Sequence, residues 1–314
     1  MNRRGWSIVA SKELVDHFSS ARFGVLLVLF GLAGTSAVVA AAGLISDQAP
    51  AASTIDSILL RIYTLPPTET VPAFVTLIGF LAPLLGIAFG FDAVNGERAQ
   101  RTLPRLLSQP IHRDDVINGK FAAGLVLVGS VLAALAMLTI GVGVLRLGII
   151  PSGQDLTRLG TWIVLTTVYV GLWHGLATLC SVVVRRSATS AFVALAVWLV
   201  TVLFLPLLTT TIAGAVAGPD ATPEEQVRTE QTIARLSPQT LYVEATRVLL
   251  DPDEATTDAL SLSQFAQVQL RFPSELPLGQ SLLVVVPQIV SLVGVTVLLF
   301  AAAYAAFMRQ EIRA

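Results

Sequence analysis

The chain has 314 residues, of which 54% are hydrophobic and 13% are charged, and its formal net charge is −1. Soluble domains carry about a quarter charged residues, so this composition predicts a protein of the lipid bilayer. The small net charge gives no strong field for attracting nucleic acid, and a single cysteine with three histidines excludes an internal disulfide and a thiol-based metal cluster.

Residues 1–22 predict an amphipathic helix. One face is apolar and the opposite face is charged, at helical spacing. The apolar face carries Ile8, Ser11, Leu14, Val15 and Phe18, and the charged face carries Lys12, Glu13 and Asp16. Because this helix runs directly into an apolar segment, we expect it to lie in the membrane interface. The alternative is a helix that packs on a neighbouring element.

Six segments meet the requirement of about 20 predominantly apolar residues for a transmembrane helix. They are residues 23–45, 72–91, 121–145, 162–184, 188–213 and 281–307. The first is longer than the apolar core of about 7–15 residues in a signal peptide, so we expect it to be retained. The sequence therefore predicts an all-α integral membrane protein with six transmembrane helices in one domain over residues 1–314.

The distribution of Lys and Arg predicts the orientation. With the N-terminus in the cytoplasm, the cytoplasmic segments carry 13 of these residues and the short outer segments carry 3. Four more lie in the long loop over residues 214–280, where the positive-inside rule has little weight. We therefore expect both termini to be cytoplasmic.

Residues 92–120, between the second and third spans, are too many for a simple connection. Leu103, Leu106 and Leu107 share one helical face, and Pro110 ends that helix. A short cytoplasmic helix with exposed leucines is typical of a docking element for another protein. The alternative is that these leucines rest on the bilayer or on the chain's own helix ends.

His174 and Asp92 are candidates for an intramembrane polar site. His174 falls near the middle of the fourth span, where ionisable groups often have a function. The alternative is a neutral histidine that forms a hydrogen bond with a neighbouring helix. Asp92 follows the second span, and its alternative role is an ion pair with a nearby arginine.

The loop over residues 214–280 predicts a small extracytoplasmic helical cap. Thr222 and Glu225 form a capping-box pattern around Pro223, and a second helix begins after Ser237 and ends before Pro252. We expect this cap to lie against the outer membrane face, with its acidic residues as a solvated surface.

Several short patterns in residues 92–120 resemble the cytoplasmic signature of ABC type-2 exporter permeases. The patterns are Gly96-Glu97, Thr102-Leu103, Leu106-Leu107, Pro110-Ile111, Arg113 and Gly119-Lys120. Within this family, the chain resembles the branch that contains the permease of the nitrous-oxide-reductase accessory transporter. The resemblance implies a coupling helix for a separate ATPase, with Glu97, Arg101, Thr102, Leu103, Leu106, Leu107 and Arg113 as the coupling residues. Arg101 departs from the family, which usually has a small residue there, most often glycine.

The resemblance also implies the assembly. Such permeases work as dimers in the plasma membrane, with two copies of a separate ATPase that binds ATP and Mg²⁺. This chain lacks the nucleotide-binding motif, because Phe121 follows Gly119-Lys120. We therefore expect a transport subunit that is not itself an enzyme and carries no cofactor, most simply as a homodimer. The alternatives are a secondary transporter driven by an ion gradient and an intramembrane enzyme.

Overall fold

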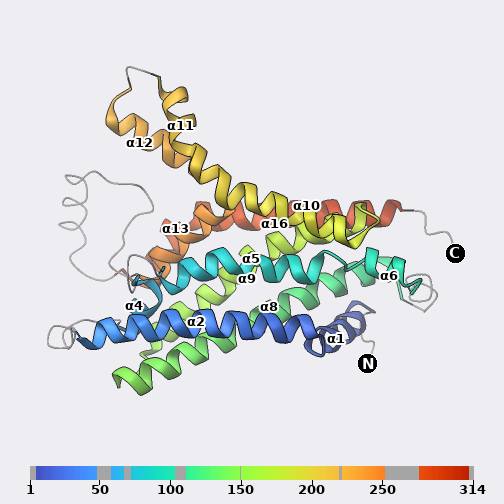
Figure 1. The fold of residues 1–314 in the computed structure, drawn as a ribbon, viewed down its shortest axis with the longest axis horizontal. Helices are drawn as coiled ribbons and strands as arrows, with labels where there is room; N and C mark the ends of the chain where they lie inside the picture. Colours follow the sequence, from blue (N-terminus) through green and yellow to red (C-terminus); the bar gives the residue numbers. More distant parts are fainter. Residues whose placement is uncertain are drawn as a thin grey trace.

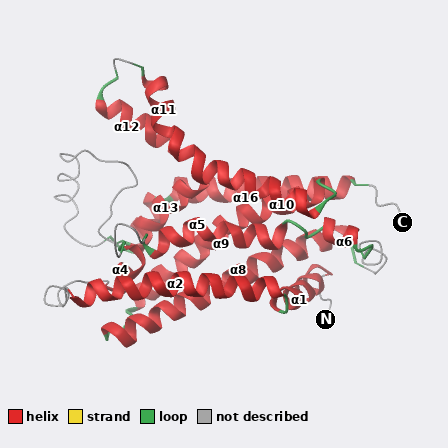
Figure 2. Cartoon of the chain, viewed as in Figure 1, coloured by secondary structure: helices red, strands yellow, loops and turns green. Residues whose placement is uncertain are grey.

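The computed structural model describes residues 5–47, 58–66, 72–102, 111–148, 150–218, 221–251 and 276–310. These residues form helices and connecting segments without a strand (Figure 2), and six helices are long and apolar enough to cross a membrane. The six run alongside one another as a bundle (Figure 1). The prediction of an all-α protein with six transmembrane helices is confirmed.

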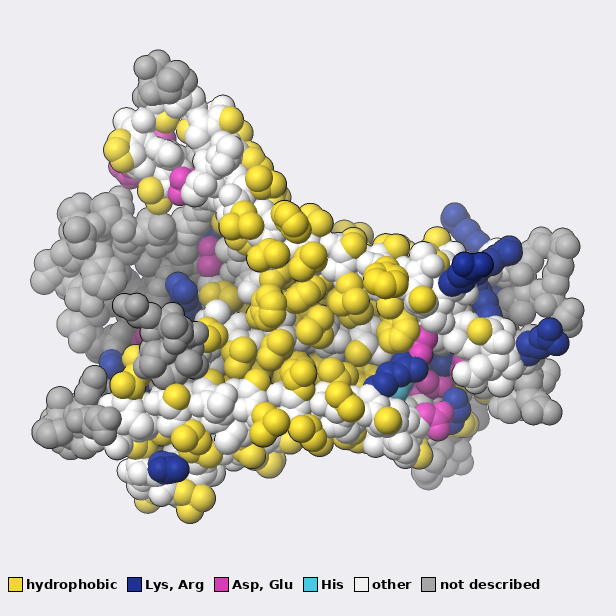
Figure 3. Space-filling model, viewed as in Figure 1, with side chains coloured by type: hydrophobic (Ala, Val, Ile, Leu, Met, Phe, Trp, Pro, Cys, Tyr) yellow, Lys and Arg dark blue, Asp and Glu magenta, His cyan; other side chains and the backbone are white. Residues whose placement is uncertain are grey.

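The long elements are α2 (Ala21–Asp47), α5 (Phe74–Gly90), α8 (Arg113–Leu147), α9 (Gly153–Val183), the continuous run of α10 (Ser187–Leu199), η1 (Val200–Phe204) and α11 (Leu205–Ala217), and α16 (Val286–Arg309). The short helices are α1 (Gly5–Phe18), α4 (Ile58–Thr64), α6 (Asn95–Ala99), α12 (Pro223–Ala234), α13 (Pro238–Leu250) and α15 (Leu278–Val284). Hydrophobic side chains cover the middle of the visible face, and charged ones gather toward the ends (Figure 3). This distribution suits a bundle whose middle contacts lipid.

Two helices begin well before the apolar segments that predicted them. α8 begins at Arg113 rather than residue 121, and α9 begins at Gly153 rather than residue 162. Asp155 and Ser152 form a capping box in which Ser152 Oγ accepts from the N–H of Asp155 at 3.1 Å. Such a cap satisfies the first N–H groups of a helix in water, so the helix extends beyond the membrane core.

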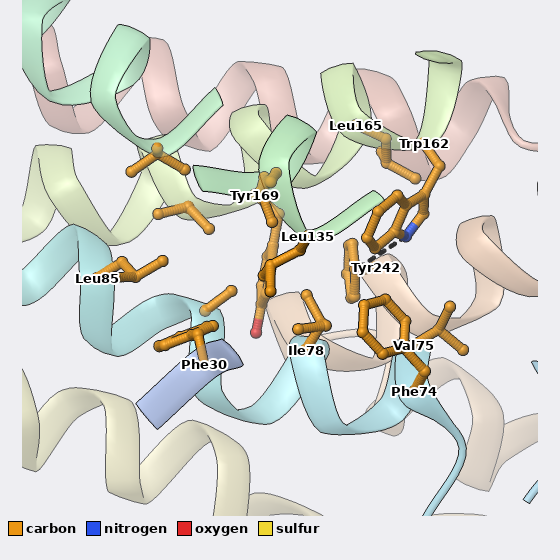
Figure 4. Close-up of a cluster of buried hydrophobic side chains, with 14 of the residues drawn as sticks. Phe30, Phe74, Val75, Ile78, Leu85, Leu135, Trp162, Leu165, Tyr169 and Tyr242 are labelled. Carbon is orange, nitrogen blue, oxygen red and sulfur yellow. Dashed lines mark hydrogen bonds between the residues drawn. The ribbon is translucent and has the colours of Figure 1, made fainter. Parts of the chain in front are cut away.

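Aromatic side chains from α5, α9 and α13 pack together within the hydrophobic core (Figure 4). Trp162 donates its indole N–H to the Tyr242 hydroxyl at 3.0 Å, and Tyr169 donates to the Gly79 carbonyl at 2.9 Å. The rings of Tyr169 and Tyr242 stack with centroids 4.4 Å apart. The indole of Trp162 and the hydroxyl groups of Tyr169 and Tyr242 thus have partners, and α13 is fixed against the bundle.

The predicted cap divides into two parts with different surroundings. Both expected helices are present as α12 and α13, and Thr222 and Glu225 form the expected capping box. In α13, however, Tyr242, Val248 and Leu249 are buried among α9, α16 and α5, whereas α12 buries none of its residues and packs along α11. The position of this loop relative to the outer membrane face stays a prediction.

The fifth span bends at η1, a π-helical turn. The N–H of Leu205 bonds to the carbonyl of Val200, five residues earlier. The next bond of this kind would join residue 206 to the Thr201 carbonyl, but Pro206 has no N–H to donate. The Ser237 hydroxyl donates to the Thr201 carbonyl at 2.9 Å instead. The bend is therefore stabilised by the N-cap residue of α13.

α1 packs against the first turns of α8. Val9, Ala10 and Glu13 are buried, and a Cβ added at Gly119 of α8 would lie 2.7 Å from the Trp6 carbonyl oxygen. α1 thus packs on a neighbouring element, which is the alternative that the sequence left open. An exposed apolar stripe remains on the other side of α1, at Ile8, Val15 and Phe18. The interfacial position of this stripe stays a prediction.

Candidate functional site

One end of the bundle carries α1, α6 and the end of α16, and we call it the α6 end (Figure 1). A pocket of about 250 Å³ opens here, between α1 and the start of α2 on one side and α6 with the end of α5 on the other. Its charged lining residues are Lys12, Glu13, Asp16, Arg22, Asp92, Glu97 and Lys120. Charged side chains of both signs are seen beside this end in Figure 3.

Lys120 lies between two carboxylates at the base of the pocket. Its Nζ is 2.9 Å from Oε1 of Glu13 on α1 and 2.8 Å from Oε1 of Glu97 on α6. The side chains of Lys120, Glu13 and Glu97 are only 5%, 9% and 17% exposed, respectively. A buried ammonium requires such partners because its desolvation is costly. The arrangement therefore joins three elements, α1, α6 and α8, at one charged atom.

The environment of Glu13 favours its charged form. Burial alone would raise the pKa of Glu13, but the ammonium groups of Lys120 and Lys12 outweigh burial and hold the pKa below its ordinary value. Lys12 is half-exposed and also pairs with Asp16 at 2.9 Å. His17, which lines the same pocket, packs edge-on against Phe89, and burial lowers its pKa. Glu13 is thus ionised at neutral pH and has two cationic partners.

α6 is held in place by hydrogen bonds to the end of α9. The Ser181 hydroxyl accepts the backbone N–H groups of Val94 and Asn95 at 2.9 and 3.1 Å, where α6 has no side-chain cap of its own. The buried Asn95 side chain donates to the Val184 carbonyl at 3.2 Å and accepts from Ser187 at 2.9 Å. α6 is therefore anchored to the elbow between α9 and α10.

Arg101 adopts a left-handed backbone conformation, with a φ of 58°. The N–H of Arg101 bonds to the carbonyl of Arg98, and the N–H of Thr102 bonds to the carbonyl of Glu97 at 2.9 Å. This pair of bonds is a Schellman motif, whose left-handed position is usually glycine. The residue that departs from the family pattern thus occupies the position where glycine is favoured, and the helix end forms nevertheless.

The predicted leucines Leu103, Leu106 and Leu107 lie outside the described residues. The chain on both sides of them is described. Arg101 and Thr102 are exposed, and Ile111 packs against a small apolar cluster that includes Phe307.

Arg113 connects α8 to the end of α16. Its guanidinium donates to the carbonyls of Phe307 and Gln310 at 3.2 and 2.9 Å, and it lies over the Phe307 ring at 5.5 Å. A cation at the carbonyl end of a helix is favourable because the carbonyls there lack helical partners. These contacts are within this chain, so the structure places Arg113 among the residues that fix the bundle.

Asp92 forms an ion pair with Arg22, with 2.6 Å between Oδ2 and Nη2. Arg22 lies in the first turn of α2, and its guanidinium is 5.3 Å from the centroid of the Phe91 ring. This contact is the ion pair expected as the alternative role of Asp92. Asp92 lines the pocket with Glu97, so these two predicted residues come together, whereas Arg113 is not among the pocket residues.

His174 is buried where α5, α8 and α9 approach closely. Its Nδ1 is 3.1 Å from the Gly86 carbonyl of α5, and its ring stacks on Phe121 of α8. A Cβ at Gly124 would lie 2.3 Å from Nε2, so only glycine leaves room for the ring. His174 is not among the pocket residues. The contacts agree with the alternative of a histidine that forms a hydrogen bond with a neighbouring helix.

The sequence interpretation missed the partnership of Glu13 and Lys120. The sequence places Glu13 on the charged face of the first helix, and Lys120 enters only the count of cytoplasmic Lys and Arg and the Gly119-Lys120 pattern. A signal was present, because Lys120 directly precedes an apolar span and is followed by Phe121. A lysine at that place needs a carboxylate partner if its side chain is buried.

The comparisons with known proteins agree with this architecture. The family described as ABC-2 family transporter protein matches the chain over residues 7–312. The chain is 28% identical over 143 residues to the probable ABC transporter permease protein NosY of Stutzerimonas stutzeri, a match over 44% of this chain and 50% of that protein. It is 27% identical over 210 residues to the NosY of Pseudomonas aeruginosa, a match over 64% of this chain and 68% of that protein. The chain thus spans half the length of the first relative. The chain therefore belongs to the ABC-2 family of transporter proteins, and it is a multi-pass membrane protein.

Proposed function

We propose that the chain is the permease subunit of an ATP-driven ABC exporter and that residues 97–113 couple it to a separate ATPase. The observation that carries the proposal is the anchoring of α6. Glu97 of α6 pairs with Lys120 of α8 at 2.8 Å, and Ser181 of α9 holds the start of the same helix. A displacement of the residues that follow α6 would therefore be transmitted to α8 and α9 through these contacts.

The leucine segment is attached to the bundle at both of its ends. The Schellman motif that closes α6 extends to Thr102, and Ile111 packs on the apolar cluster with Phe307. Leu103, Leu106 and Leu107 lie between these attachment points in the sequence. A segment held at both ends and carrying an apolar face suits a groove in another protein. We propose that this groove belongs to the ATPase, which also binds ATP and Mg²⁺.

The orientation supports the same proposal. The short segments that we assign to the cytoplasm hold 13 Lys and Arg residues against 3 in the short outer segments. α1, α6 and the end of α16 lie in or beside these cytoplasmic segments, and all three are at the same end of the bundle (Figure 1). By the positive-inside rule the α6 end is cytoplasmic. We further propose a location in the plasma membrane and a complex of two permease and two ATPase subunits, by analogy with the family.

The test is recovery of the ATPase with the tagged permease. Leu106→Asp would bury an unpaired charge in the proposed interface, which costs several kcal/mol, so recovery should fall by orders of magnitude at matched membrane expression. The control is Leu236→Asp at the exposed connection between α12 and α13, which should leave recovery unchanged. Equal recovery of the ATPase with Leu106→Asp and the parent protein would remove the coupling proposal. Activity of the purified chain without any ATPase would favour the secondary transporter or the intramembrane enzyme.

A further inference from the structure

We propose that Lys120 is a positioning residue that transmits movement of the coupling segment, residues 97–113, to α1, and through α1 to the first span. This inference rests on the proposed coupling function. The three groups concerned are the Lys120 ammonium and the carboxylates of Glu13 and Glu97, which come from α8, α1 and α6. All three side chains are largely buried, so their charges do not serve simply to solvate the surface of the protein.

The two carboxylates are not held equally. Oε1 of Glu13 is 3.1 Å from Nζ of Lys12 and 2.9 Å from Nζ of Lys120. Glu97 pairs through Oε1 only, and its buried Oε2 has no hydrogen-bond partner among the described residues. Glu13 is therefore held by two cations and Glu97 by one. Because both carboxylates share the Lys120 ammonium, a shift of Glu97 with α6 draws Lys120 along, and Lys120 in turn displaces Glu13 of α1.

The connection from α1 to the first span is direct. The Ser20 hydroxyl accepts from the N–H of Phe23 at 3.2 Å and donates to the carbonyl of His17 at 2.7 Å, which joins the end of α1 to the start of α2. Arg22 then pairs with Asp92 across the pocket. A displacement of α1 would thus reach α2 and the end of α5.

α1 is also placed to move along a membrane surface. Ile8, Val15 and Phe18 are 49%, 65% and 47% exposed, on the side away from α8. An apolar stripe of this kind can slide in the lipid interface without exposing new apolar area to water. The Lys120 pairs are then the specific contacts that tie the position of α1 to that of α6.

The experiment compares two fluorescent probes in the complex of permease and ATPase, reconstituted in lipid nanodiscs. The only cysteine, Cys180, is replaced by alanine, and an environment-sensitive dye is attached at Ile8→Cys on α1 or at Gln100→Cys at the end of α6. ATP with Mg²⁺ is added to each. In the parent protein we expect both probes to respond.

Lys120→Met should abolish the response at Ile8 and preserve the response at Gln100, and Lys120→Arg should restore the response at Ile8. Because Lys120→Met leaves two buried carboxylates together, a triple variant with Glu13→Gln and Glu97→Gln provides a neutral site, and it should also lose the response at Ile8. The matched control is Lys12→Met, which removes a cation from Glu13 without touching Glu97, and it should keep both responses.

An undiminished response at Ile8 in Lys120→Met and in the triple variant would overturn the role of Lys120 while leaving the coupling proposal intact. A silent Gln100 probe in the parent complex would instead overturn the proposed coupling function, and the role of Lys120 with it.

Discussion

The backbone N–H of Thr102 bonds to the carbonyl of Glu97, and Arg101, in the left-handed region, lies between them in the sequence. This turn ends α6 with a residue that has a Cβ where glycine is favoured. The conformation costs a residue other than glycine about 1 kcal/mol or more. The end of α6 is therefore less stable than the same turn would be with glycine.

Arg101→Gly should strengthen this turn. The relief of about 1 kcal/mol corresponds to about fivefold slower hydrogen exchange at the Thr102 amide, reduced in part by the greater freedom of glycine in the open chain. Hydrogen exchange measured by mass spectrometry checks this. The control is Gln100→Gly, where φ is −83° and glycine brings no relief, so exchange should become faster. Faster exchange in Arg101→Gly would contradict the Schellman assignment.

The orientation predicts which positions a membrane-impermeant thiol reagent reaches in intact cells. In a Cys180→Ala background, a cysteine at Glu230 on α12 should be labelled, and one at Gln100 should react only after the membrane is permeabilised. The reason is the excess of Lys and Arg in the segments assigned to the cytoplasm. Labelling at Gln100 in intact cells would reverse the topology and remove access of an ATPase to the α6 end.

The lowered pKa of Glu13 predicts that acid weakens the attachment of α1 to α8. Because the folded state binds this proton less readily than the unfolded state, the contribution of Glu13 to stability is present above its ordinary pKa and is lost as the pH falls through the lowered value. Thermal unfolding of the solubilised protein, measured from neutral to acidic pH, should therefore be less acid-sensitive in Glu13→Gln than in the parent.

The control for Glu13 is Glu224→Gln, which changes an exposed carboxylate on α12. This variant should keep the acid profile of the parent protein. If Glu13→Gln and Glu224→Gln gave identical profiles, the buried pair with Lys120 would not contribute as argued.

The close approach of α5 and α9 predicts a strong effect of a single methyl group. A Cβ at Gly86 would lie 2.6 Å from the Val170 carbonyl oxygen and 2.9 Å from the His174 amide nitrogen, which are backbone atoms. Gly86→Ala should therefore destabilise the bundle by about 1–3 kcal/mol. Gly141→Ala in α8 meets nothing within 4 Å and should be neutral or slightly stabilising. The midpoint of thermal unfolding in detergent distinguishes the two, and equal midpoints would contradict the packing.

Local patterns were sufficient for the helices but not for their surroundings. The capping box at Thr222 and Glu225 and the helix that starts after Ser237 were predicted, because caps and prolines act over a few residues. That α13 would bury Tyr242 against Trp162 was not predictable, since the two residues are 80 positions apart. A period of 3.6 shows which residues share a face, but the element that covers the face depends on the packing of the whole bundle.

The candidate site shows the same division. The sequence by itself determined that this is a six-span protein, because length and hydropathy are local properties, and the family resemblance pointed to Glu97 as a candidate. The partners of Glu97 were decided by the tertiary structure. Lys120 lies 23 residues from Glu97 and 107 residues from Glu13. Folding of the bundle removes water from these three charged groups. The resulting desolvation cost makes ion pairs between them necessary, and it arises only in the folded protein.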